Sequence, residues 1–186
     1  MHRNNTGLTL IELIVGLAII GILTGMAAPS FNRIIGRNEA ASAINWIIRA
    51  VLFTRQSALT YGVLTTLCPS EDGNTCGGNW HDGVLIFTDA NGDRIINDHD
   101  RMLIRLQYPY PGSTIKWRSF RNRQYLQITG MGYTHSQNGN FVYCPEDRDL
   151  QFSRQIVINV QGRVRKSYDH DNDGLVEDRY NNLLRC

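Results

Sequence analysis

The feature that most constrains this chain is an uninterrupted apolar run near its N-terminus. Residues 8–28 read LTLIELIVGLAIIGILTGMAA, and Glu12 is the one charged residue among them. A run of this length is long enough to cross the hydrocarbon core of a membrane as a helix. His2 and Arg3 precede the run, and basic residues on that side predict that the N-terminus stays in the cytoplasm. We therefore expect a single membrane-spanning helix and an exported remainder.

Glu12 decides what kind of membrane segment this is. A cleaved secretory signal has a shorter apolar core followed by small residues and a cut, and Pro29 directly after Ala28 is a poor neighbour for that cut. A plain anchor fits the length but leaves the carboxylate unexplained, since such a charge costs about 2.5–3.5 kcal/mol on insertion scales. An acid within a membrane segment indicates a function that supplies a partner for it.

The residues around the start of the run resemble the type III signal of type IV pilins and type II secretion pseudopilins. Gly7 precedes the sequence LTLIEL. The resemblance implies that a prepilin peptidase cuts after Gly7 and that the new terminus, Leu8, where phenylalanine is commonest, is methylated. Glu12 is then the fifth residue of the mature chain, and Pro29 takes the place of the family's kinking proline. The family implies that Glu12 neutralises the freed amino group of a neighbouring subunit, which pairs the buried charge after assembly.

The chain beyond the apolar run also has a helical pattern. Residues 30–61 contain no proline, and Gly62 is a plausible stop. We expect one helix over residues 8–61, about 80 Å long at 1.5 Å per residue, with bends at Pro29 and Gly36. Apolar side chains at three- and four-residue spacing indicate the face that a sheet covers: Phe31, Ile34, Ile35, Ile48, Val51, Leu52 and Leu59.

The rest of the chain is rich in short β-branched and aromatic segments separated by Gly, Asn, Asp and Pro. Pairs at 138–139 (Asn-Gly) and 161–162 (Gln-Gly) are typical of hairpin turns. The fold class is therefore α+β, a long N-terminal helix packed on a small β-sandwich. The expected parts are a leader over 1–7, a helix over 8–61 with its fibre or membrane half at 8–28, and a globular domain over 62–186. Strands are expected at 63–67, 83–88, 102–108, 113–119, 125–129, 140–144, 155–160 and 163–168.

The four cysteines fit an oxidising compartment. Cys68 and Cys76 bracket a turn-rich loop that a bridge would close, and Cys144 with Cys186 would then tie the C-terminus to a strand. The sequence allows three pairings, and we favour this one over free thiols. The cysteines form no C-x-x-C pair, which argues against a zinc module.

Two further segments narrow the resemblance to minor pilins of the GspH/FimT/FimU type. A cysteine loop, Trp80 and Gly83 precede an apolar strand that ends in FTDAN. Near the C-terminus, the sequence GRVR at 162–165 resembles the GRxR motif of FimT-type pilins, which implies DNA binding in natural transformation. Here a tail of about twenty residues follows the motif, in place of a brief one, and is a candidate cover for it.

Charge allows DNA binding only through a local patch, since the formal net charge is +2. In a strand, Lys116 and Arg118 would face solvent while Trp117 enters the core. The alternative is a solvated strand face, paired with acids of a neighbouring subunit or with the nearby Asp169, Asp171 and Asp173. The candidate DNA-binding residues form two clusters, Arg163, Arg165 and Lys166, and Lys116, Arg118, Arg121 and Arg123.

Two acidic loops resemble calcium-binding loops in the spacing of their oxygen ligands. In the first, Asp89, Asn91 and Asp93 precede Asn97 and Asp100, but Arg94 replaces the usual glycine. In the second, Asp169, Asp171, Asp173 and Gly174 fit well and Glu177 falls at the ninth position, while Tyr180 holds the twelfth, for which Asp178 is a substitute. The alternative for both is an Asx-turn between strands. No other cofactor is expected.

Nothing in the sequence indicates catalysis, because the histidines are scattered and nucleophile signatures are missing. We expect Trp46, Trp80 and Trp117 to pack the sandwich against the helix. The predicted function is a minor pilin that primes or caps the tip of a type IV pilus. The alternatives are a DNA-binding tip pilin and a type II secretion pseudopilin. Expected partners are other pilins, the prepilin peptidase, the inner membrane before assembly and, in the first alternative, DNA. The expected location is the inner membrane, then the periplasm and the cell surface.

Overall fold

The computed structural model of the chain describes residues 9–186, except for the side chains of residues 26–30. The long helix, α1, covers Leu10–Tyr61, which matches the expected helix closely. The helical assignment continues through positions 29 and 36. The chain divides into two compact units, Met1–Asn38 and Glu39–Cys186. This division lies within α1 and not at its end, because the helix from Glu39 onward belongs to the core of the second unit.

The first unit presents apolar side chains to its surroundings. Leu10 is 77 % exposed, and Ile14, Leu17, Ile20 and Leu23 are also exposed. Within the part of the chain that the structure describes, no helix meets the length and hydropathy required of a membrane span.

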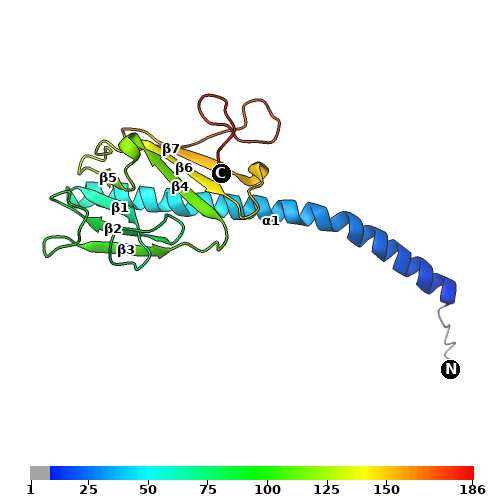
Figure 1. Cartoon of the computed structure of the whole chain (residues 1–186). Helices are drawn as coiled ribbons and strands as arrows, with labels where there is room; N and C mark the ends of the chain where they lie inside the picture. The colour runs from blue at the N-terminus through cyan, green and yellow to red at the C-terminus, as the bar shows by residue number, and fades with distance from the viewer. Residues whose placement is uncertain (1–8) are drawn as a thin grey trace, which may run out of the picture. The chain divides into compact units, whose positions relative to one another are not determined.

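The second unit contains two four-stranded antiparallel sheets, as the α+β prediction required (Figure 1). The first sheet has the order β3-β2-β1-β5, and the second has the order β4-β6-β7-β8. All eight expected strands are present, and none of their ends is shifted by more than two residues. Their bounds are β1 Thr65–Pro69, β2 Gly83–Thr88, β3 Met102–Gln107, β4 Thr114–Ser119, β5 Leu126–Ile128, β6 Gly139–Cys144, β7 Arg154–Ile158 and β8 Val164–Lys166, with short 3-10 helices at Phe120–Asn122 and Leu150–Phe152.

The main core joins the second half of α1 to the inner faces of both sheets. The expectation that all three tryptophans pack there is confirmed, since Trp46, Trp80 and Trp117 are buried. Trp117 stacks on Phe141 with ring centroids 4.3 Å apart, and the Trp80 ring meets the edge of the Phe141 ring at 4.7 Å. Trp46 makes an edge contact of 5.2 Å with Tyr108.

The prediction of which face of α1 the sheets cover is largely wrong. Phe31 is 64 % exposed, and Ile34, Ile35, Leu52 and Leu59 are exposed as well. Phe31, Ile34 and Ile35 precede the second unit, and Leu52 and Leu59 lie outside the stripe that the core uses. Small side chains dominate that stripe, which allows the backbone of α1 to approach the sheets closely. The buried helix residues are Ala40, Ala43, Ile44, Trp46, Ile47, Ala50, Val51, Thr54, Ser57 and Ala58.

One predicted hairpin turn is also wrong. Gly139 is the first residue of β6, and it pairs with Ser119 of β4. A Cβ atom at position 139 would lie 2.1 Å from the backbone oxygen of Arg118, so glycine is required here by close backbone packing and not by a turn. The pair at 161–162 does form a turn, in which the Gly162 N–H donates to Asn159 O at 2.9 Å with φ +68° at Gly162.

The disulfides are Cys68–Cys76 and Cys144–Cys186, the pairing that the sequence favoured. The second bond fixes the end of the C-terminal tail, residues 167–186, on the outer face of the second sheet. Leu184 is buried there against Val142 and Cys144, with Val176 packed beside it. Lys116 of β4 donates to the backbone oxygen of Cys186. The tail therefore covers part of this sheet at β6. It does not cover the motif at 162–165 as expected, since Arg163 and Arg165 are exposed.

A buried hydroxyl links α1 to the second sheet. The Tyr143 hydroxyl donates to Glu39 Oε1 at 3.1 Å. Burial, and then the negative charge of Glu39, raise the pKa of Tyr143 well above its usual value. Burial likewise raises the pKa of Tyr108, which shares a hydrogen bond with Ser113, to about 12. No pattern in the sequence indicated this contact, because Glu39 and Tyr143 are 104 residues apart in the chain.

The two disulfides should differ in their contribution to stability. The sequence separation is 42 residues for Cys144–Cys186 and 8 for Cys68–Cys76. Loop-closure entropy then predicts a loss of about 4 kcal/mol for the Cys144→Ser, Cys186→Ser variant and about 2.5 kcal/mol for the Cys68→Ser, Cys76→Ser variant. Urea unfolding of both double variants measures the difference. A larger loss from the short loop would contradict the prediction.

Tyr143 should make the fold sensitive to alkali. The raised pKa of Tyr143 means that the unfolded chain ionises first, so this stability is present below about pH 10 and is lost as pH rises towards the folded pKa. The Tyr143→Phe variant should lose about 1–2 kcal/mol near neutrality, with the hydrogen bond, and its stability should fall less steeply above about pH 10. Urea unfolding across this pH range is the measurement. Tyr168→Phe, at an exposed position, is the control and should keep the wild-type slope.

Candidate functional site

The N-terminal end of α1 places Glu12 in a reciprocal cap. Glu12 Oε2 accepts from the backbone N–H of Thr9 at 2.9 Å and from the Thr9 hydroxyl at 2.8 Å. The Glu12 N–H donates to Thr9 Oγ1 at 3.3 Å. This is the capping-box arrangement, in which two free donors of the first helical turn are satisfied together. Gly7 and Leu8, the predicted processing residues, lie outside the described residues, and the Pro29 side chain is not described either.

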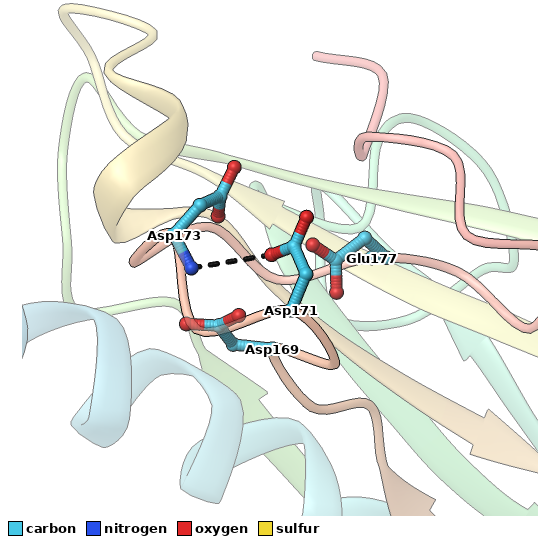
Figure 2. A group of neighbouring side chains, drawn as sticks. All are labelled: Asp169, Asp171, Asp173 and Glu177. Atoms are coloured by element: carbon cyan, nitrogen blue, oxygen red, sulfur yellow. Dashed lines mark hydrogen bonds between the residues drawn. The ribbon is translucent and has the colours of Figure 1, made fainter.

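The second acidic loop brings its predicted ligands together (Figure 2). One carboxylate oxygen from each of Asp169, Asp171, Asp173 and Glu177 lies within 4.8 Å of the others. Backbone N–H groups orient the aspartates, since Asn172 and Gly174 donate to Asp169 at 2.7 and 2.9 Å, and Leu175 donates to Asp173 at 2.8 Å. Asp178, the predicted substitute for a ligand at the twelfth position, does not belong to this group.

Asp178 has a different task, which corrects that part of the prediction. Its Oδ1 accepts from the backbone N–H groups of Tyr180 and Asn182 at 2.8 and 3.0 Å. Burial opposes ionisation of Asp178, but these hydrogen bonds from Asn182 and Tyr180 hold its pKa below the usual value. The side chain therefore closes the next turn of the tail, over residues 178–182.

The first acidic loop is arranged as a turn. Asp89 is buried, and its Oδ2 accepts from Thr66 Oγ1 at 2.6 Å, Gln127 Nε2 at 3.0 Å and the Arg94 N–H at 3.1 Å. Asn91 donates to Asp93 at 2.8 Å. These donors satisfy Asp89 Oδ2, whereas Oδ1 is buried without a hydrogen-bond partner among the described residues. Since the described carboxylates of this loop do not form a group close enough to share an ion, we propose no metal there. The one group of carboxylates close enough to share an ion, among the described residues, is in the second loop.

The basic residues occupy two edges of the second sheet. The register places Arg118, Asn140, Val157 and Arg165 in one row across β4, β6, β7 and β8. Paired residues of an antiparallel sheet point to the same face, so Arg118 and Arg165 share the outer face, where both are exposed. Lys116 and Arg118 are exposed and Trp117 is buried, as the alternation of β4 predicted.

The predicted clusters are less continuous than the sequence suggested. Lys166 pairs with the buried Ile156, and its Nζ donates to Asn45 of α1 at 3.2 Å, so it points away from the outer face. Arg121 lies over the ring of Phe120 at 5.5 Å, and Arg123 over that of Tyr125 at 5.9 Å. Arg94 also lies over Tyr125, at 4.9 Å. That ring already contacts protein cations and is half-buried, whereas Phe120 remains exposed.

Comparison with known proteins matches two family models to the chain. Residues 43–162 match the family described as type II transport protein GspH. Residues 2–28 match the prokaryotic N-terminal methylation motif. The first match covers most of the globular unit, and the second covers the predicted leader and apolar run.

Comparison with solved structures finds two kinds of similar protein, a type IV minor pilin and a type II secretion minor pseudopilin. The type IV minor pilin FimU of Pseudomonas aeruginosa is 18 % identical with a TM-score of 0.54, over 71 % of this chain and 90 % of FimU. The minor pseudopilin EpsH of the Vibrio cholerae type II secretion system is 13 % identical with a TM-score of 0.47, over 74 % of this chain and 99 % of EpsH. The first of these supports the fold. With the family match over residues 43–162, the chain belongs to the GspH family of minor pilins and pseudopilins.

Proposed function

We propose that this chain is a minor pilin of a type IV pilus, built into the fibre through α1. The observation that carries the proposal is an exposed apolar helix with one carboxylate in its first turn, in a chain whose residues 2–28 match the methylation motif. The inner membrane holds residues 8–28 before assembly, and the apolar fibre core holds them afterwards. The globular unit is exported to the periplasm and then to the cell surface. Its role is structural and not catalytic.

The proposed assembly step exchanges the partner of Glu12. A prepilin peptidase cuts after Gly7 and the amino group of Leu8 is methylated. In the single chain, Glu12 accepts hydrogen bonds from Thr9, a cap that contributes about 1 kcal/mol. An ammonium group of a neighbouring subunit offers a full opposite charge in an apolar medium, where such attraction is much stronger than in water. The charge pair therefore favours the assembled fibre over the separate subunit.

The proposed position of this chain in the fibre is the tip. A minor subunit is one expected in few copies, so it does not build the repeating shaft. We propose that this chain primes or caps the tip beside other pilins. The alternative is a type II secretion pseudopilin, the description that the EpsH structure carries.

The charge of Glu12, and not its cap, should be needed for assembly. The Glu12→Gln variant keeps the hydrogen bonds of the capping box, because glutamine serves at this position, but it loses the charge. We expect it to accumulate in the inner membrane, with incorporation into sheared pili at least about tenfold lower, which corresponds to about 1.4 kcal/mol. Immunoblots of the membrane and sheared fractions measure this. Asp98→Asn, in an exposed loop, is the control.

Normal incorporation of Glu12→Gln would contradict the charge-pair mechanism. Absence of the wild-type chain from sheared pili, together with a block in protein export on its deletion, would instead support the pseudopilin alternative.

A second candidate function is DNA binding at the tip. The observation that favours it is the exposed pair of Arg118 and Arg165 in one row of the outer face. Arg163 is exposed directly before β8. Several arginines on one face contact several phosphates, with an affinity that falls steeply with salt. The proposed contacts are made by Arg118, Arg163 and Arg165, and by Lys116, Arg121 and Arg123 at the β4 edge. Lys166 is excluded because its Nζ donates to Asn45.

The Arg163→Ala, Arg165→Ala variant tests this second function. If DNA binds here, the variant should lose at least about tenfold in affinity and show a shallower dependence on salt. The measurement is a titration of the detergent-solubilised chain into labelled double-stranded DNA at two salt concentrations. Arg101→Ala, Arg105→Ala removes the same charge from exposed positions at β3 and should bind as wild type does. Equal loss in both variants would indicate a nonspecific charge effect.

A further inference from the structure

We propose that the loop over residues 169–177 is a calcium site, with Asp169, Asp171, Asp173 and Glu177 as ligands. The bound ion would link the start of the C-terminal tail to the part of the tail that lies on the sheet. This inference is independent of the fibre function proposed above. It rests on the geometry of the four carboxylates and on one buried oxygen atom of Glu177.

The separation of the carboxylates suits one calcium ion. Calcium binds oxygen at about 2.3–2.6 Å, so two oxygens on opposite sides of one ion lie at most about 5 Å apart. The four ligand oxygens lie within 4.8 Å of one another, which places them within that limit. They come from a segment of nine residues, and Figure 2 shows the carboxylates of Asp171 and Glu177 side by side.

Glu177 supplies the second observation. Its side chain is only 4 % exposed. Oε2 accepts from the His170 N–H at 2.8 Å, whereas Oε1 is buried and has no hydrogen-bond partner among the described residues. A buried carboxylate oxygen without a partner is costly. A cation held between Glu177 and the aspartates supplies the missing partner and offsets the charge of the cluster.

The aspartates are held in position by the loop itself. Asp171 accepts from the Asp173 N–H at 3.2 Å. Asp169 and Asp173 likewise accept from backbone N–H groups of the loop. Each of these oxygens retains a lone pair for a metal ion. Gly174, with φ +92°, allows the chain to turn beneath the cluster.

The chemistry of the ligands selects the ion. All four are carboxylates, which suit calcium, magnesium and manganese better than zinc or copper. Magnesium requires near-ideal octahedral geometry and keeps several waters, whereas calcium tolerates an irregular loop. Loops of this kind in extracellular proteins bind calcium with dissociation constants of about 10⁻⁴–10⁻³ M, which suits an exported domain.

The ion would connect two parts of the tail. Glu177 forms a β-bridge with Leu183, and its N–H donates to Tyr168 O at 3.3 Å. The neighbouring Leu184 is buried on Val142. An ion bound to Glu177 and to the aspartates therefore links residues 169–173 with the segment that lies on the sheet. Without the ion, four negative charges repel one another at this place.

The test uses the detergent-solubilised full chain, with disulfides intact and metals removed by a chelator. Calorimetric titration with Ca²⁺ should show one site, and Ca²⁺ should raise the melting temperature and slow proteolytic cleavage of residues 167–186. Asp171→Asn and Glu177→Gln should each weaken Ca²⁺ binding at least about tenfold, since each removes a charged ligand. Asp93→Asn, in the first acidic loop, is the matched control and should bind as wild type does.

The melting temperature of Glu177→Gln distinguishes loss of a calcium ligand from a general loss of stability. Glu177→Gln keeps an acceptor for the His170 N–H and removes a buried charge, so without Ca²⁺ it should melt at or above the wild-type temperature. It should nevertheless lose the rise caused by Ca²⁺. The proposal is overturned if millimolar Ca²⁺ does not bind, if Mg²⁺ binds equally well, or if Asp171→Asn and Glu177→Gln bind Ca²⁺ like wild type.

Discussion

The burial of the second half of α1 is the interaction on which the globular unit depends. One stripe of this helix contacts the inner faces of both sheets, and Ala40, Ala43, Ala50 and Ala58 lie in it without exposed area. Small side chains give little apolar area of their own, but they allow close packing, and Trp80, Trp117 and Phe141 belong to the same core cluster as these alanines. Among the described residues, the other apolar clusters, around Leu85 and Phe87 and around Val142 and Leu184, are much smaller. We therefore expect the sheets and the helix to be stable only together.

The first half of the same helix poses the opposite physical problem. Its large apolar residues, from Leu10 to Leu23, are exposed, and such a surface is not stable in water. A lipid or a bundle of pilin helices would cover it, and the charge of Glu12 is acceptable in either place only with a partner. In the single chain that partner is Thr9. The proposed fibre replaces it by a stronger one, which gives assembly a direction.

Much of this fold was predictable because local patterns determined it. β2 was predicted to the residue, and the other strands nearly so, because short β-branched segments stand between turn residues. The cysteine pairing followed from a compact loop around Cys68 and Cys76. The covered face of α1 was not predictable from large apolar side chains alone, because alanines line much of that face together with Ile44 and Ile47. Gly139 was misjudged for a similar reason, since the backbone of β4, and not a turn, excludes a side chain.

The features that the sequence did not predict come from contacts between distant residues. These contacts determine which side chains are exposed on the outer face of the second sheet. The sequence placed Lys166 beside Arg163 and Arg165, but strand alternation turns it towards Asn45. The tail covers Val142 and Cys144 on that face, whereas Arg118 and Arg165 stay exposed. The acidic loop of the tail carries four carboxylates, and Val176, directly before Glu177, packs against the cluster of Val142, Cys144 and Leu184. A bound calcium ion would cancel part of that charge and would thereby make the same region more favourable for an anionic partner. The proposed calcium site and the proposed DNA contacts therefore involve the same face of the second sheet, so the charge of the tail contributes to what that face would bind.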